Sequence, residues 1–257
     1  MTFIESAVDT SYGKIAFKSV GDYSSKTCIV FLHDAIGSSS IWGSFPMKVY
    51  KATQLPVLVF DRLGYGKSDE EHGIRATNYL QYEAEIRMPE LFEKLGISAP
   101  ILIGHSDGGS IALVYAANFQ TKAVFSMAGH VYEEEITRQG IIDFTTQKDF
   151  DVINSKLEKH HGLKTKKLIS AWRDTWLTEE YRTWNIESYL PKISCPVFAI
   201  QGENDEYATA QHLLDIQKGI GENCQIKFIE NCGHVPYKEK TDESLMLALD
   251  FISQIEY

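Results

Sequence analysis

The sequence predicts an α/β fold in which a mostly parallel, doubly wound β-sheet is covered by helices on both faces. Short apolar runs rich in β-branched residues recur along the chain, at residues 27–32, 57–60, 101–103, 123–127, 197–200 and 226–229. Stretches with helical character separate these runs, and this alternation is typical of strands buried between two helical layers. With 257 residues, 44% of them hydrophobic, the chain has the size and apolar content of one domain, with or without an insertion.

Local signals predict the elements that flank these runs. Residues 3–9 and 14–20 predict two antiparallel strands around a turn at residues 10–13. Residues 79–95 carry apolar side chains near helical spacing and end at Gly96, a residue type that favours helix C-termini. Residues 245–255 predict the closing helix.

The stretch from Gly129 to about Leu190 breaks this alternation. It holds no convincing strand and is rich in charged and aromatic residues. We therefore expect a helical insertion at residues 129–190, between a first part of the core at 1–128 and a second part at 191–257. The helices of the insertion are expected at residues 133–144, 148–160, 163–176 and 178–189.

The composition argues against several classes of partner. A formal net charge of −10 disfavours nucleic acid and anionic membrane surfaces, because both are bound by concentrated Lys and Arg. The first residues show neither the basic start nor the apolar core of a signal peptide, and no run approaches the roughly 20 apolar residues of a membrane span. A cytoplasmic location is the default expectation. Cys28 and Cys195 lie in predicted strands and are interpreted as small buried thiols.

No metal or other cofactor is expected. The scattered histidines and aspartates lack metal-ligand spacing, and His160 and His161 are expected at a solvated helix end. Residues 66–68, Gly-Lys-Ser, match the end of a phosphate-binding loop. That loop requires a glycine five positions earlier, where this chain has Asp61, so a nucleotide site is rejected.

The most informative motif is the sequence GHSDG at residues 104–108, which fits the pattern G-x-S-x-G. It follows the apolar run 100–103 and precedes a helix-like stretch at 109–117. Strand, tight turn and helix in this order are the context of a nucleophile elbow, which holds the serine hydroxyl, here of Ser106, where a substrate can reach it. Alone, the motif also fits a glycine-rich turn that happens to contain a serine.

Two later loops supply an acid and a base. Asp205 has Gly-x-x-Asp spacing after the run 197–200, although Glu203 and Glu206 flank it, and His234 follows the run 226–229. A serine hydroxyl is a poor nucleophile at neutral pH, so His234 would take its proton while Asp205 orients and stabilises the imidazole. The alternative for His234 is a loop histidine with a structural hydrogen bond.

With serine, aspartate and histidine in this order, the chain resembles the α/β-hydrolase superfamily over nearly its whole length. Two further motifs carry the resemblance: LHDA at residues 32–35 is similar to the oxyanion loop, and DRLGYGKS at residues 61–68 to the turn after the next strand. The resemblance implies an oxyanion hole formed by the backbone N–H groups of Ala35 and Asp107. It also implies that residues 129–190 form a cap.

Two residues depart from the family pattern. Asp34 stands where glycine is usual, and Asp107 where an apolar residue is common. Two carboxylates near a forming oxyanion would oppose it unless they are paired, protonated or turned away. They could bind a polar or cationic part of the substrate, share a proton with each other, or cap loop and helix N–H groups. For Asp107, in a first helical turn, capping is favoured; for Asp34 these interpretations stay open.

Aromatic and histidine residues of the insertion and its flanks are candidates for the substrate pocket. Trp172 and Trp176 are four positions apart and would share one helix face, where Trp184 and Tyr207 could join them. Residues with this spacing serve more often in packing than in substrate binding. His130 begins the insertion, and it either faces the pocket or is a linker residue.

The resemblance implies a serine hydrolase that cleaves a small ester, thioester or lactone through an acyl-enzyme at Ser106, with a small molecule as its partner. Within the same fold the alternatives are a C–C bond hydrolase or a lyase that depends on the same three residues. In another class, the alternative is a small-molecule receptor without catalytic activity. The sequence indicates no oligomeric state.

Overall fold

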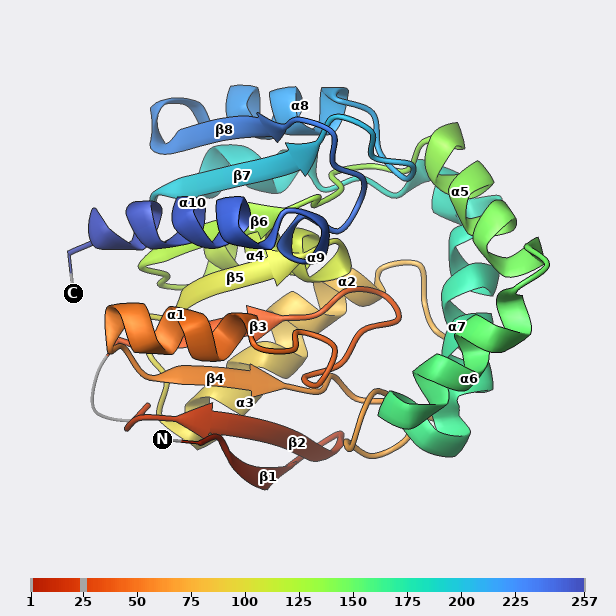
Figure 1. Ribbon diagram of the computed structural model, residues 1–257, viewed down its shortest axis with the longest axis horizontal. Helices are drawn as coiled ribbons and strands as arrows, with labels where there is room; N and C mark the ends of the chain where they lie inside the picture. The colour runs from red at the N-terminus through yellow and green to blue at the C-terminus, as the bar shows by residue number, and fades with distance from the viewer. Residues whose placement is uncertain (1, 24–26, 257) are drawn as a thin grey trace.

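The computed structural model describes residues 2–23 and 27–256, which form an eight-stranded sheet with helices on both faces (Figure 1). The strand order is β1-β2-β4-β3-β5-β6-β7-β8. β1 (Ile4–Thr10) and β2 (Gly13–Val20) form an antiparallel hairpin, and β2 is also antiparallel to β4 (Val57–Phe60). From β4 onward all neighbours are parallel, through β3 (Ile29–Leu32), β5 (Ile101–His105), β6 (Ala123–Met127), β7 (Val197–Gly202) and β8 (Cys224–Ile229). The predicted fold class is confirmed.

The central strands are apolar on both faces because helices cover both. In β3, Ile29 and Phe31 pack into the core under α1 and α10, whereas Val30 and Leu32 pack into the core on the opposite face. This is why these strands are continuous apolar runs rather than alternating ones. The helices of the two layers are α1 (Phe45–Thr53) and α10 (Thr241–Ser253) on one face, and α3 (Met88–Leu95), α4 (Asp107–Asn118) and α8 (Gln211–Ile220) on the other.

The helix predicted at residues 79–95 is present with a local change of pitch. It consists of α2 (Tyr79–Tyr82), a π-helical segment η1 (Glu83–Arg87) and α3, and it ends at Gly96 in the left-handed region with φ 70°. Glycine adopts that conformation without steric cost, which explains the stop. Two short elements, η5 (Gly221–Asn223) and α9 (Pro236–Glu239), precede β8 and α10 respectively.

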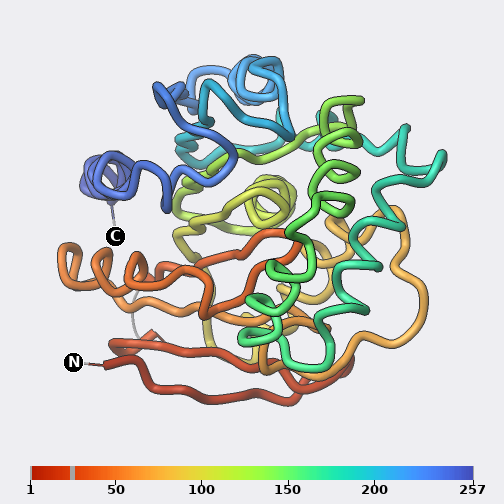
Figure 2. The backbone as a smooth tube through the Cα atoms, turned by 45° about the vertical axis from the view of Figure 1, so that its right-hand side comes forward, coloured from red at the N-terminus to blue at the C-terminus, as the bar shows by residue number. Residues whose placement is uncertain are grey.

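An inserted helical segment lies between β6 and β7, at the carboxyl ends of the parallel strands (Figure 1). Its long helices stand beside one another at one side of the molecule, away from α1 and α10 (Figure 2). They are α5 (Glu135–Thr146), α6 (Phe150–His161) and α7 (Thr165–Trp176), with the 3₁₀ turn η2 (Gly162–Lys164) joining the last two.

The helix predicted at residues 178–189 is wrong. Two 3₁₀ turns, η3 (Glu180–Thr183) and η4 (Glu187–Lys192), occupy this stretch. Between them Trp184 is extended, with ψ 128°, and Asn185 forms an antiparallel bridge with Tyr132. A tertiary contact therefore overrides the helical spacing here.

The expected solvated position of His161 is also wrong. His161 is only 3% exposed, because the end of α6 docks against the loop that follows β4. Its Nδ1 accepts the backbone N–H of Gly66 at 3.0 Å, and its Nε2 donates to the carbonyl of Ile36 at 3.0 Å. Within the described ranges, no helix has the length and apolar character needed to span a membrane.

Candidate active site

The turn between β5 and α4 places Ser106 at the carboxyl edge of the sheet. Ser106 has φ 53° and ψ −120°, a conformation that non-glycine residues rarely adopt. A Cβ atom at Gly104 would lie 2.2 Å from the carbonyl oxygen of Gly108, and one at Gly108 would lie 2.0 Å from that of Leu32. Both glycines are therefore required for the strand and helix to approach so closely.

The side chains of Ser106, His234 and Asp205 form one continuous hydrogen-bonded chain. His234 Nε2 lies 2.9 Å from Ser106 Oγ, and His234 Nδ1 lies 2.8 Å from Asp205 Oδ1. Asp205 and His234 stand on the loops after β7 and β8, which end at the same edge of the sheet as β5. Because a carboxylate only accepts, Nδ1 carries the proton and Nε2 is free to accept one from the serine.

Asp205 and His234 each stabilise the charged form of the other. Burial would lower the pKa of His234, but the Asp205 carboxylate, together with the charges of Glu206 and Asp34, raises that pKa above its ordinary value. Burial would likewise raise the pKa of Asp205, and the imidazole of His234 keeps it below its ordinary value. The arrangement thus stabilises the imidazolium form that appears when His234 takes up a proton.

The side chain of Asp107 neither caps the helix nor pairs with Asp34. Its Oδ2 accepts a 2.8 Å hydrogen bond from the hydroxyl of Tyr79 and lies 3.4 Å from the guanidinium of Arg62. Burial raises the pKa of Asp107, while the charge of Arg62 opposes that effect. The capping and shared-proton interpretations of Asp107 are therefore wrong, because a buried cation and a phenol lie within reach of its carboxylate.

Asp34 has different partners. Its Oδ1 accepts the backbone N–H of Ile36 at 3.0 Å, which is the loop-capping contact, and its Oδ2 lies 3.4 Å from Nδ1 of His105. Burial would raise the pKa of Asp34, but the contact with His105 lowers it. Asp34 is also one of the residues that line the cavity beside Ser106.

A cavity of about 250 Å³ opens in front of the Ser106 hydroxyl. Trp172, Trp176 and Tyr207 line it, as do Ala35 and the other residues predicted for the site except Asp205 and Trp184. Several other residues that line the cavity were not predicted, because they belong to no sequence motif. They are Ile36, Ile41, Thr137, Ile141, Phe144, Leu157, Glu206, Val235 and Lys238.

Trp184 does not line this cavity. It packs behind Trp176, with ring centroids 5.7 Å apart, and its indole N–H donates to Gln81 Oε1 at 3.0 Å. The extended backbone at Trp184 removes it from the helix face that Trp172 and Trp176 share. The placement of Trp184 in the pocket is therefore wrong.

His130 lines the cavity but is held as a neutral residue. Its Nε2 donates to the carbonyl of Tyr207 at 3.2 Å. Burial, together with the nearby imidazoles of His212 and His234, lowers the pKa of His130 to about 3. Among the described residues, no group of three or more His, Cys, Asp or Glu side chains is arranged to hold a metal ion.

Comparison with known proteins gives sequence relatives and solved structures with a similar fold. The chain is 26% identical to a proline iminopeptidase of Lactobacillus crispatus, over 93% of this chain and 94% of the relative. It is 22% identical to a 2-hydroxy-6-oxo-6-phenylhexa-2,4-dienoate hydrolase of Comamonas testosteroni, over 99% of this chain and all of the relative. A solved carboxylesterase of Bacillus subtilis superposes with a TM-score of 0.72 at 16% identity, covering 98% of this chain and 92% of that chain.

The model of one family matches most of the chain. It spans residues 29–244, from the first parallel strand into the closing helix, and its description is the alpha/beta hydrolase family. This match includes the serine turn and both loops that carry Asp205 and His234. The chain therefore belongs to the alpha/beta hydrolase family.

Proposed function

We propose that this protein is a serine hydrolase that cleaves a small ester, thioester or lactone, with Ser106, His234 and Asp205 as its catalytic triad. The observation that carries the proposal is the hydrogen-bonded chain from Asp205 through His234 to Ser106, which ends at a cavity. A hydroxyl whose proton is accepted by an oriented imidazole is the arrangement that nucleophilic acyl transfer needs.

The reaction would proceed in two halves. Ser106 Oγ attacks the carbonyl carbon of the substrate while His234 Nε2 takes the hydroxyl proton. The backbone N–H groups of Ala35 and Asp107 would bind the oxyanion, and His234 would then return the proton to the leaving oxygen or sulfur. In the second half, His234 would take a proton from water as the water oxygen attacks the acyl carbon. It would then pass that proton to Ser106 Oγ as the acyl–oxygen bond breaks, which releases the acid and restores the serine hydroxyl.

The cavity supports a compact substrate. Its volume of about 250 Å³ lies below the range of roughly 300 to 1,000 Å³ that is typical of sites for drug-sized ligands. Its walls include Ile141, Phe144 and Trp172 of the inserted helical segment, so we assign that segment the role of a cap over an apolar acyl group.

The test is the initial rate on p-nitrophenyl esters from acetate to octanoate, for the wild type and for Ser106→Ala. The proposal expects hydrolysis by the wild type, best on short chains, and a loss of at least about 1,000-fold in kcat in Ser106→Ala. Equal rates in the two proteins, with Ser106→Ala shown to be folded by circular dichroism, would refute it.

A peptidase is the second candidate, because several curated relatives that align over most of this chain are named proline iminopeptidases. Proline p-nitroanilide, assayed beside the esters, separates the two functions. The same panel includes 2-hydroxy-6-oxo-6-phenylhexa-2,4-dienoate, the compound named for the Comamonas relative, which tests hydrolysis of a carbon–carbon bond. Tight ligand binding without turnover on any of these compounds would favour a receptor.

A further inference from the structure

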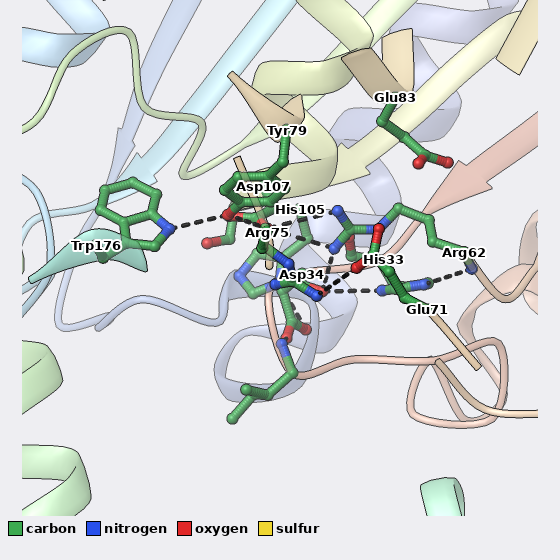
Figure 3. Close-up of polar contacts among 12 residues, drawn as sticks. His33, Asp34, Arg62, Glu71, Arg75, Tyr79, Glu83, His105, Asp107 and Trp176 are labelled. Atoms are coloured by element: carbon green, nitrogen blue, oxygen red, sulfur yellow. Dashed lines mark hydrogen bonds and ion pairs between the residues drawn. The ribbon is translucent and has the colours of Figure 1, made fainter. Parts of the chain in front are cut away.

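A buried arginine, Arg62, lies within reach of Asp34 and Asp107, two residues of the turns that would form the oxyanion hole (Figure 3). Arg62 follows β4 in the motif at residues 61–68, and its side chain is only 2% exposed. Its Nη2 donates to the backbone carbonyl of Asp34 at 2.7 Å. The same guanidinium lies 3.4 Å from Oδ2 of Asp107. One side chain therefore contacts the Asp34 carbonyl, in the peptide unit that also carries the N–H of Ala35, and the side chain of Asp107.

The contact with Asp34 determines the direction of one donor. In a planar trans peptide unit the C=O and the following N–H point in opposite directions. The carbonyl of Asp34 and the N–H of Ala35 belong to one such unit. Because Arg62 holds the carbonyl, the N–H of Ala35 points away from Arg62, and Ala35 lies on the cavity wall.

The second donor is tied to the inserted helical segment. The hydroxyl of Tyr79 donates to Asp107 Oδ2 at 2.8 Å and accepts the indole N–H of Trp176 at 2.8 Å. Trp176 ends α7 and lines the cavity. A continuous set of contacts thus runs from the cap side of the pocket through Tyr79 and Asp107 to Arg62 (Figure 3).

We infer that Arg62 is a positioning residue of the oxyanion hole, which orients both backbone donors, and that Tyr79 couples this arginine to Trp176 on the cavity wall. The inference rests on the proposed function. The distances favour positioning over simple charge pairing. The shorter bond of Arg62, at 2.7 Å, goes to the peptide of the oxyanion loop, and the longer contact, at 3.4 Å, goes to the carboxylate.

The test compares Tyr79→Phe and Arg62→Lys with a matched control, Tyr189→Phe. Tyr189 also donates a 2.8 Å hydrogen bond to a carboxylate, that of Glu85, but it does not line the cavity. The probes are p-nitrophenyl butyrate as substrate, butane-1-boronic acid and butyrate. In the boronic acid adduct, Ser106 Oγ bonds to boron, its proton passes to His234, and the tetrahedral anion occupies the oxyanion hole; butyrate reports ground-state binding.

Tyr79→Phe is expected to lower kcat about tenfold, with KM within about twofold, since a misdirected donor costs part of the 100-fold to 1,000-fold loss of a deleted donor. Boronic acid affinity should fall by the same factor, while butyrate affinity stays unchanged. In Arg62→Lys, kcat and boronic acid affinity should each fall about 100-fold, because one ammonium cannot bind both partners of the guanidinium. Tyr189→Phe should match the wild type in kcat and boronic acid affinity.

Wild-type boronic acid affinity in Tyr79→Phe, whatever its thermal stability, would overturn the inference even if Arg62→Lys fails to fold. If the wild type hydrolyses the ester but the variants lose only stability, the inference fails and the proposed function stands. If the wild type neither hydrolyses the ester nor binds the boronic acid, the proposed function fails, and the inference with it.

Discussion

The imidazole of His105 donates a 2.8 Å hydrogen bond from Nε2 to the main-chain carbonyl of His234, across 129 positions of sequence. His105 immediately precedes Ser106, so this bond ties the serine turn to the loop that carries the proposed base. The other ring nitrogen lies 3.4 Å from the carboxylate of Asp34. One buried side chain therefore connects the serine turn with both loops that border the proposed oxyanion hole and base.

His105→Phe keeps a ring at this position and removes both contacts. The loop of His234 would lose its tie to the turn, and we expect kcat/KM to fall about tenfold, with the free energy of unfolding lowered by about 1 to 3 kcal/mol for the unpaired carbonyl. Ester hydrolysis and urea denaturation measure the two effects. His72→Phe, at an exposed histidine, is the control and should change neither. A wild-type rate in His105→Phe would show that the bond does not position the base.

The pH dependence of kcat/KM should follow the imidazole of His234. A general base acts when it is unprotonated, so the rate rises as pH increases through the pKa of His234. The Asp205 carboxylate raises that pKa, so Asp205→Asn should lower it and shift the acidic limb to lower pH. The plateau should fall by about 10⁴-fold, as expected when the imidazole loses its orienting partner. An unshifted limb in the pH–rate profile would contradict the assignment of Asp205.

Asp34→Asn should give a smaller shift with the same sign. The Asp34 carboxylate also raises the pKa of His234, but its effect is weaker than that of Asp205. We therefore expect the acidic limb to move slightly to lower pH, measured on the same substrate. No change in either limb would remove the charge of Asp34 from the mechanism and leave only its loop-capping bond to Ile36.

Trp172 and Trp184 form a matched pair for testing substrate size. They are 6% and 5% exposed, but only Trp172 lines the cavity. Replacing either with leucine should destabilise the protein by a few kcal/mol, about the cost of other large-to-small core changes. Only Trp172→Leu should move the optimum of the p-nitrophenyl ester series to longer acyl chains. The same optimum in both variants would contradict the assigned cavity wall.

Substitutions at Gly108 and Gly43 distinguish the cost of steric overlap from the cost of a strained backbone conformation. A Cβ at Gly108 would lie 2.0 Å from the Leu32 carbonyl, whereas Gly43 has φ 57° with open space around it. We expect Gly108→Ala to lower the free energy of unfolding by about 3 kcal/mol or more through overpacking. Gly43→Ala should cost about 1 to 2 kcal/mol for its left-handed backbone. Urea denaturation compares them, and equal losses would contradict the close approach of α4 to β3.

The sequence by itself determined the sheet and the family. Each parallel strand buried on both faces must be a continuous apolar run, and a serine turn packed against a strand must have glycine on both sides, so both features are visible in the residues. The helix expected at 178–189 failed because the pairing of Asn185 with Tyr132, distant in sequence, decides that backbone. Local spacing contains no information about such a partner.

Only the tertiary structure decided which side chains meet at the site. Ser106, Asp205 and His234 stand on separate loops, and their hydrogen bonds exist because three parallel strands end at one edge. The partners of Asp107 could not be deduced, since Arg62 belongs to another strand's loop and Tyr79 to a helix that carries no motif. A buried charge requires a partner, but the sequence does not say which residue it is, because the fold brings the two together.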